Sequence, residues 1–223
     1  MKRLFAILIV IILPLGLAAC DGENRPPPPP PPNTVYAIYG VHPDETNLEN
    51  LDNRLANTAE SIQSMLRNLG YPGAAVTAIA NQRIRAEVPD TDDAAELLRI
   101  IGESVTIYFQ IEGVTYVRGR DIVNAYTVNV GGNYAVQIEL NAQGTQDLLE
   151  ATNDNIGKVI SIIAEHNGVW QTISAPVIQA AIPNGRPMIV GNFTYEEAGR
   201  LAKQILAGAF SVKLELLETN LTE

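Results

Sequence analysis

Apolar residues along the chain recur with two different periods, which predict alternating helices and strands. Between residues 48 and 69 they recur in steps of three and four, so that they share one face of a helix; they are Leu48, Leu51, Leu55, Ala59, Ile62, Leu66 and Leu69. Thr46 and Glu49 have the spacing of a capping box, and Gly70 and Pro72 stop the pattern. We therefore expect a helix over residues 46–69.

The other elements of the first half complete a familiar order. Strand patterns precede and follow the helix, two of them form a hairpin at Asn81-Gln82, and a second helix ends at Gly102. The expected strands are 34–40, 74–80, 83–88 and 105–111, and the second helix covers 94–102 after a cap at 90–93. The order β-α-β-β-α-β predicts a ferredoxin-like base lobe over residues 34–112, with an antiparallel sheet and both helices on one face.

The second half predicts a further α+β lobe, the head, over residues 113–223. It begins with a hairpin around Gly131-Gly132, and a second hairpin has the strong turn signal Asn167-Gly168. The expected strands are 121–130, 134–140, 158–164, 169–173, 188–190 and 210–217, with an extended segment at 176–182 and helices at 141–155 and 194–208. We expect a mixed or antiparallel sheet, closed by the strand at 210–217.

The N-terminus has the pattern of an export signal. Lys2 and Arg3 precede a short apolar run with helix breakers near its end, and Leu-Ala-Ala-Cys follows at 17–20. This tetrapeptide resembles a bacterial lipobox, in which the cysteine sulfur is acylated and the chain is cleaved before it. We expect a signal peptide over residues 1–19 and lipidation of Cys20. A transmembrane anchor with an incidental cysteine is the alternative.

Residues 20–33 read as the acylated cysteine and a linker. Seven consecutive prolines, 26–32, lack amide donors and favour polyproline II. At about 3.1 Å per residue the tract is a semi-rigid spacer of roughly 22 Å. We expect a spacer here rather than a ligand for an SH3-like groove. The protein is then expected at the cell membrane, lipid-anchored on the extracytoplasmic face, periplasmic or extracellular.

Charge and cysteine content narrow the function classes. The chain has 15 basic and 25 acidic residues, a formal net charge of -10, and loss of Lys2 and Arg3 with the signal peptide would leave -12. Nucleic acid and anionic lipid head groups repel such a surface on average. Cys20 is the single cysteine, so no disulfide forms within one chain.

Three motifs in the second half resemble one family. They are Asn-Ile-Gly-Lys at 155–158, Ile-Ser-Ala-Pro-Val-Ile at 173–178 and Gly-Asn-Phe-Thr-Tyr-Glu-Glu-Ala at 191–198. In this order and spacing they are similar to the head of the first periplasmic domain of SecD, a protein-export subunit. A looser likeness to the base lobe of that family includes residues 67–70, 83–89 and 97–109, so that the resemblance covers about 58–217.

The chain also departs from the SecD pattern. A SecD subunit has several membrane helices, and no apolar run of that kind follows residue 20. The family's Gly-rich apolar motif before the base is replaced by residues 34–46, and its proline-containing segment after the last head helix is replaced by 210–213. We therefore expect a stand-alone lipoprotein form that carries no proton flow but keeps transient contact with unfolded polypeptides.

The expected peptide-contact site lies where prolines interrupt the strand pattern of the head. Pro176 and Pro183 would leave a strand edge open to an extended segment. The residues expected to contact it are Ile173, Ser174, Ala175, Pro176, Ile178, Asn192 and Phe193. A purely structural turn is the competing interpretation, and Phe193 could equally pack on Ala198 as a hydrophobic staple.

Catalytic and metal-binding patterns are weak. His42 and His166 fall in expected loops, and Ser174 is not in a nucleophile elbow. The acidic pairs at 92–93 and 196–197 lie in first helical turns, where the helix dipole accounts for them. We expect no enzyme activity, no metal and no cofactor.

Three functions therefore compete. The first is a tethered SecD-like module that binds unfolded or translocating polypeptides or translocon subunits and assists export without catalysis. The second is a structural or regulatory envelope lipoprotein that uses the same fold to bind one fixed partner. An exported enzyme is the third, and fold resemblance alone cannot choose among them.

Overall fold

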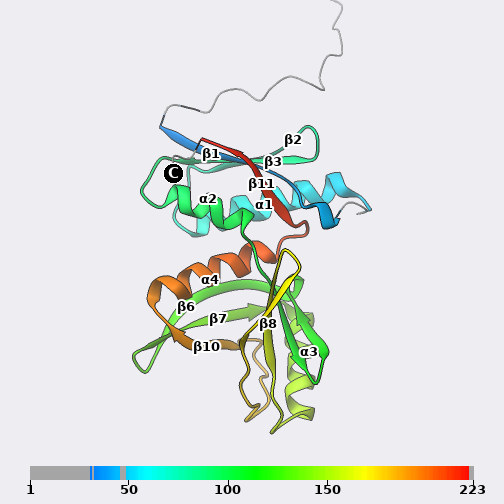
Figure 1. Cartoon of the computed structure of the whole chain (residues 1–223). Helices are drawn as coiled ribbons and strands as arrows, with labels where there is room; N and C mark the ends of the chain where they lie inside the picture. The colour runs from blue at the N-terminus through cyan, green and yellow to red at the C-terminus, as the bar shows by residue number, and fades with distance from the viewer. Residues whose placement is uncertain (1–30, 32, 46–48, 221–223) are drawn as a thin grey trace, which may run out of the picture.

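The computed structural model describes residues 31, 33–45 and 49–220, and these residues form two lobes of helix and antiparallel sheet (Figure 1). The signal segment, Cys20 and most of the proline tract lie outside the described residues. Each lobe has its own cluster of buried apolar side chains. The α+β class expected from the sequence is confirmed.

The base lobe is a four-stranded antiparallel sheet in the order β11-β1-β3-β2. Its strands are β1 (Thr34–Val41), β2 (Ala75–Ile79), β3 (Arg83–Pro89) and β11 (Leu214–Thr219), and its helices are α1 (Leu51–Asn68) and α2 (Ala94–Gly102). Both helices cover the same face of the sheet (Figure 1). With β11 as the fourth strand, this is the ferredoxin-like strand order.

The origin of that fourth strand differs from the prediction. Residues 105–111 were expected to complete the base sheet, but as β4 (Thr106–Ile111) they pair with strands of the head. Residues 210–217 were expected to close the head, but β11 pairs with β1. Alternation of apolar and polar residues shows that one face of a strand is buried, but it does not identify the element that covers this face. Ile107, Phe109 and Ile111 are buried in the core of the head, whereas Leu214 is buried in the core of the base.

The head is therefore inserted between α2 and β11, and sheet membership does not follow a division at residue 112. It contains a sheet of order β5-β4-β8-β9 and a second sheet of order β10-β7-β6. The strands are β5 (Val114–Arg118), β6 (Ile122–Val130), β7 (Asn133–Leu140), β8 (Ser161–His166), β9 (Val169–Ser174) and β10 (Met188–Phe193), with helices α3 (Ala142–Asp154) and α4 (Tyr195–Gly208). β5 is an additional strand that the sequence pattern did not indicate. Two short 3-10 turns lie at Pro43–Glu45 and Gly119–Asp121.

Local signals positioned most of these elements correctly. β2 and β3 form the expected hairpin, but its loop has three residues, 80–82, because Ile79 pairs with Arg83; Asn81 and Gln82 in this loop both have positive φ. Thr194 and Glu197 form the reciprocal capping box at the start of α4, and Asn141 caps α3 through Gly144. The start of α1 was predicted wrongly: its N-cap is Asn50, and Thr46 lies outside the described residues.

The chain passes between the lobes twice, and these two crossings pack closely. A Cβ on Gly208, at the end of α4, would lie 1.8 Å from the carbonyl oxygen of Val105 in the other crossing. A Cβ on Gly119 would lie 2.9 Å from the carbonyl oxygen of Gly208. Glycine is therefore required at Gly208 by close approach of backbone to backbone. We call this contact the junction.

Gly208→Ala is expected to destabilise the protein by about 1–3 kcal/mol or more, because the new methyl group overlaps backbone that cannot rotate away. Gly199→Ala in the same helix is the matched control, since its Cβ would meet only Thr127 Oγ1 at 3.7 Å. Alanine there should be neutral or stabilise by about 0.5–1 kcal/mol. Denaturant midpoints of the two variants measure the difference, and equal midpoints would contradict the junction contact.

Candidate functional site

The predicted peptide-contact residues occupy two neighbouring places in the head. Residues 173–178 continue from the end of β9, and Asn192 and Phe193 end β10. Ser174 joins the two places, because its Oγ donates a hydrogen bond to the carbonyl oxygen of Val190 at 3.1 Å. The structure thus brings the two predicted segments together at the point where β9 meets β10.

The segment around Pro176 is a short paired arm. Ile160 N donates to Pro176 O, and Ile178 N donates to Lys158 O, both at 2.9 Å. Val159 and Val177 face each other across this bridge and are 46% and 52% exposed. Ile178 is buried in the core, whereas Ala175 is exposed and Pro176 half-buried. The arm therefore exposes apolar valines while Ile178 anchors it.

Phe193 belongs partly to the core. It packs against the buried cluster of the head, and the register of β10 against β7 shifts between Val190 and Phe193. Gly191 lies in this bulge, where a Cβ would meet the Phe193 ring at 2.8 Å. Asn192 in the same bulge is exposed. Packing is thus a demonstrated role of Phe193, and Asn192 is the more accessible of the pair.

The outer edge of β10 has backbone groups that point away from its sheet. Ile138 N donates to Pro187 O at 3.0 Å, which makes this a hydrogen-bonded pair of the ladder. Since bonded and non-bonded pairs alternate in antiparallel sheets, Met188 and Val190 direct their backbone groups away from β7. Their side chains are 40% and 46% exposed. The carbonyl oxygen of Val190 accepts the Ser174 hydroxyl, and no strand pairs with the other outward backbone groups of Met188 and Val190. This edge therefore combines backbone groups outside any ladder with apolar side chains.

The strand β9 is likewise at the end of its sheet, and its first four residues are exposed. Val169 is 69% and Trp170 55% exposed. The edges of β9 and β10 touch at Ser174 and Val190 without forming a ladder. We call these two edges, with their exposed apolar side chains, the open-edge surface.

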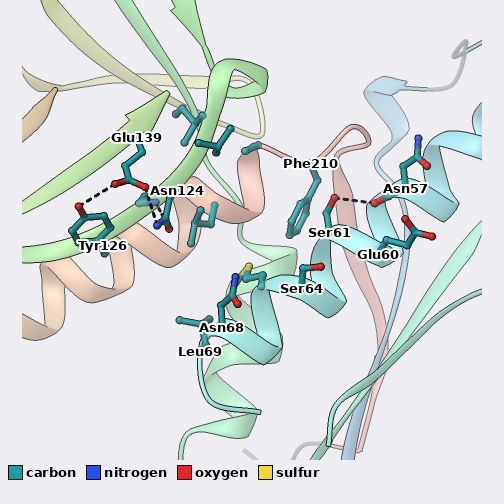
Figure 2. A pocket seen from close by; sticks show the side chains of 16 residues that line it. Asn57, Glu60, Ser61, Ser64, Asn68, Leu69, Asn124, Tyr126, Glu139 and Phe210 are labelled. Atoms are coloured by element: carbon teal, nitrogen blue, oxygen red, sulfur yellow. Dashed lines mark hydrogen bonds between the residues drawn. The ribbon is translucent and has the colours of Figure 1, made fainter. Parts of the chain in front are cut away.

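A cleft of about 960 Å³ separates the lobes on one side of the junction (Figure 2). Figure 2 shows α1 supplying polar groups to one wall, with Asn57, Ser64 and Asn68 among them. Across the cleft, Glu139 accepts hydrogen bonds from Asn124 Nδ2 and Tyr126 OH, both at 3.3 Å. Amide and hydroxyl groups of this kind can bind a peptide backbone. No sequence motif indicates the cleft, because it exists only where the two lobes meet.

A second groove, of about 490 Å³, lies at the junction and contains three aromatic residues. The Trp170 ring contacts the Tyr108 ring at a centroid distance of 4.9 Å, and Phe210 lines the groove further along. We call it the aromatic groove. Burial raises the pKa of Tyr108, the Glu165 carboxylate adds to this, and Arg118 opposes it. The Tyr108 hydroxyl therefore remains a hydrogen-bond donor at neutral pH.

An ion pair crosses the junction beside the aromatic groove. Lys213 Nζ lies 3.2 Å from Glu165 Oε1, and the two side chains are 14% and 12% exposed. Burial by itself raises the pKa of Glu165, but the amide of Gly168 and the Lys213 ammonium outweigh it and hold the pKa below its ordinary value. The pair links β8 of the head to the segment that enters β11 of the base.

The two histidines have structural contacts. His166 Nδ1 lies 2.9 Å from the carbonyl oxygen of Ser104, and its Nε2 lies 3.1 Å from the Asn167 amide nitrogen. The backbone N–H of His42 donates to Lys213 O. Within residues 33–45 and 49–220, no cluster of three His, Cys, Asp or Glu side chains could hold a metal ion. No helix in that part of the chain is long and apolar enough to span a membrane.

Comparison with protein families gives the evolutionary context of these two lobes. The family model described as "SecDF, P1 head subdomain" matches residues 99–212, just over half of the chain. This chain belongs to the SecDF P1 head subdomain family. The matched region begins within α2 and stops before β11, so it coincides with the inserted head.

Relatives named as SecD extend the match into the base. The protein translocase subunit SecD of Sebaldella termitidis is 34% identical over 167 residues, which are 72% of this chain and 40% of the relative. That of Dictyoglomus turgidum is 30% identical over 173 residues, 77% of this chain and 42% of the relative. The chain thus spans about two fifths of the length of these SecD relatives.

Solved SecDF structures have the same fold. A chain from a study titled "Structure and function of a membrane component SecDF that enhances protein export" aligns with a TM-score of 0.64 at 22% identity, over 82% of this chain and 98% of that one. SecDF in the "Super-membrane-facing form" aligns with a TM-score of 0.66 at 21% identity, over 83% of this chain and 30% of that one. At this identity the likeness establishes the fold alone.

The ion pair between Glu165 and Lys213 predicts a pH dependence of stability. A carboxyl whose pKa is lower in the folded than in the unfolded protein stabilises the fold above its unfolded pKa, near 4.5, and this contribution disappears as the pH falls through the folded value. Glu165→Gln should therefore cost about 1–3 kcal/mol at pH 7 and much less near pH 3. Denaturant unfolding at the two pH values measures this.

Glu112→Gln is the control for this experiment, because it removes an ion pair with Lys158 whose side chains are 69% and 45% exposed. An exposed pair should contribute about 0–1 kcal/mol. A loss in Glu165→Gln that is equal at pH 7 and pH 3, or no larger than in the control, would contradict the stabilising role of the junction ion pair.

Proposed function

We propose that this chain is a membrane-anchored SecD-like extracytoplasmic domain that binds unfolded or translocating polypeptides, or the export machinery, and assists protein export without catalysis. The observation that carries the proposal is the open-edge surface, where two strand edges of the head adjoin exposed apolar side chains. Such edges are a general means of binding extended chains.

The open-edge surface fits the chemistry of an unfolded chain. Every residue of an extended polypeptide except proline offers one N–H and one C=O, so backbone pairing with Met188 and with the N–H of Val190 does not depend on sequence. Apolar side chains of the bound segment would meet Val190 and the bridged valines Val159 and Val177. The predicted contacts Ala175, Pro176 and Asn192 border this surface, while Ile178 and Phe193 support it from the core.

The membrane anchor in this proposal is acylated Cys20 after removal of residues 1–19. Each buried CH₂ of an acyl chain contributes about 0.8 kcal/mol, so two or more chains hold a protein stably on a bilayer. The proline tract would then separate the lobes from the membrane by roughly 22 Å. This arrangement would keep the open-edge surface on the extracytoplasmic side, where exported chains emerge.

The names of the related proteins favour an export role over other uses of the fold. The curated relatives are named as protein translocase subunits, and one solved relative is described as a membrane component that enhances protein export. Because the chain spans about two fifths of those SecD relatives, their full activity is not assumed for it. Polypeptide binding is the part of their activity that the two lobes of this chain could supply.

A photo-crosslinking residue at Val190 is expected to capture several secretory proteins or translocon subunits in living cells, because Val190 lies on the open edge of β10 and is 46% exposed. Leu217 is the matched control position, since it is equally exposed, at 45%, but lies on β11 of the base. Mass spectrometry of the adducts provides the measurement.

Two outcomes would count against this function. Identical adduct profiles at positions 190 and 217 would show that the open-edge surface is not the site of polypeptide binding. A single stoichiometric partner at position 190 would instead favour the structural or regulatory envelope protein that binds one fixed partner.

Cys20→Ser is expected to abolish acylation, because the sulfur is the attachment point of the proposed lipid, and to leave residues 1–19 on the chain, because cleavage at a lipobox follows acylation. Incorporation of an alkyne-labelled fatty acid and the mass of the purified chain measure the two effects. The Gly22→Ser variant is a nearby control that keeps the cysteine. If the wild-type chain incorporates no labelled fatty acid and is still found in the membrane fraction, a transmembrane anchor holds it instead.

A further inference from the structure

The proposed export function gives no role to the side chains that line the aromatic groove. Trp170 is the only tryptophan of the chain, yet it is 55% exposed. Its ring packs against that of Tyr108 with an angle of 35° between the ring planes. Aromatic side chains usually bury most of their area, so an exposed tryptophan that packs on a half-buried tyrosine marks a surface that can bind apolar rings. Phe210 adds a third aromatic side chain to the groove.

The groove is also rich in hydrogen-bond donors. The indole N–H of Trp170 and the hydroxyl of Tyr108 have no hydrogen-bond partner within the described part of the chain. Arg118 and Arg120 add guanidinium groups to the lining, and the ammonium of Lys213 is paired with Glu165. Together with Arg54 there are four basic side chains against the two carboxylates of Glu45 and Glu165. The groove is thus locally positive in a chain of net charge -10.

Aromatic faces beside donors complement one kind of ligand in particular. A run of prolines has apolar rings and no N–H, so its backbone offers only carbonyl acceptors. Polyproline helices bind to aromatic-lined grooves in this way, and they lose little entropy because they are already extended. The chain itself contains such a run, the seven prolines 26–32.

Chain length decides which copy of that run could reach the groove. β1 begins next to the tract at Thr34 and runs for eight residues, or about 24 Å, before its other end reaches the junction. The tract spans roughly 22 Å. If it folded back along β1, only its first proline would approach the groove, so the chain lengths favour the tract of another copy.

We propose that the aromatic groove binds the proline tract, residues 26–32, of a second copy of this chain. Proline rings pack on Trp170 and Tyr108, and tract carbonyls accept hydrogen bonds from the indole, the phenol and Arg118. The contact joins copies of the protein head to tail. It is independent of the open-edge surface, and so of the proposed polypeptide binding.

The single tryptophan allows a direct test, because its fluorescence reports on the groove alone. The full chain, with serine in place of each proline at 26–32 to remove competition, is prepared in detergent micelles and titrated with a peptide of residues 21–33. The expected result is a saturable blue shift of the Trp170 emission. A peptide with serine at the seven proline positions should bind at least about tenfold more weakly.

Two tyrosine variants locate the binding site. Tyr108→Leu should weaken binding of the proline peptide by about tenfold, whereas Tyr126→Leu, in the cleft on the other side of the junction, should leave it unchanged. If Tyr108→Leu fails to fold, the binding site is located instead from the amide and indole ¹⁵N–¹H chemical shifts of the chain with tyrosine at position 108. The proposal then requires the Trp170 indole resonance to move with the proline peptide and not with the serine peptide.

Sedimentation of the unaltered full chain tests the second copy. Self-association that rises with concentration and disappears when serine replaces the prolines supports the proposal. A monomer at all concentrations whose Trp170 is nevertheless shielded by the tract would overturn it, since the chain would then occupy its own groove. Equal binding of the proline and serine peptides, or no shift of Trp170 with either, would overturn it as well.

Discussion

The pairing of β1 with β11 is the constraint on which the whole arrangement depends. The base sheet is complete only when the last strand of the chain returns to pair with the first, and the entire head lies between α2 and that strand. The chain must therefore cross between the lobes twice. The two crossings meet at Gly208 and Val105 with no room for a side chain, so the lobes join through backbone packed on backbone.

Several polar contacts reinforce this junction. Ser211 Oγ donates to the carbonyl oxygen of Arg54 at 3.1 Å, and Arg200 pairs with Glu96 across α4 and α2 at 2.9 Å. The ion pair of Glu165 and Lys213 is more buried than that of Arg200 and Glu96. Each of the two grooves lies on one side of the junction, so their shapes depend on how the lobes are held together.

The three binding surfaces differ in what they can bind because they differ in chemistry. The open-edge surface offers backbone groups and apolar side chains, which suit an extended chain of any sequence. The cleft beside α1 is lined with amides and hydroxyls, and its Glu139 is already occupied by Asn124 and Tyr126. The aromatic groove combines the exposed Trp170 ring and the half-buried rings of Tyr108 and Phe210 with basic side chains. Burial, edge position and charge separate these surfaces more clearly than any motif does.

The sequence by itself determined most of the local elements, β5 and the start of α1 excepted, and the family. Helical spacing, the capping box at Thr194 and the Asn167-Gly168 turn depend on neighbouring residues, and the structure has all three features. Only the tertiary structure decided which sheet receives β4 and β11, and that Trp170 meets Tyr108. Those contacts join residues far apart in the chain, and a period of two shows that a strand has a buried face without identifying what covers it.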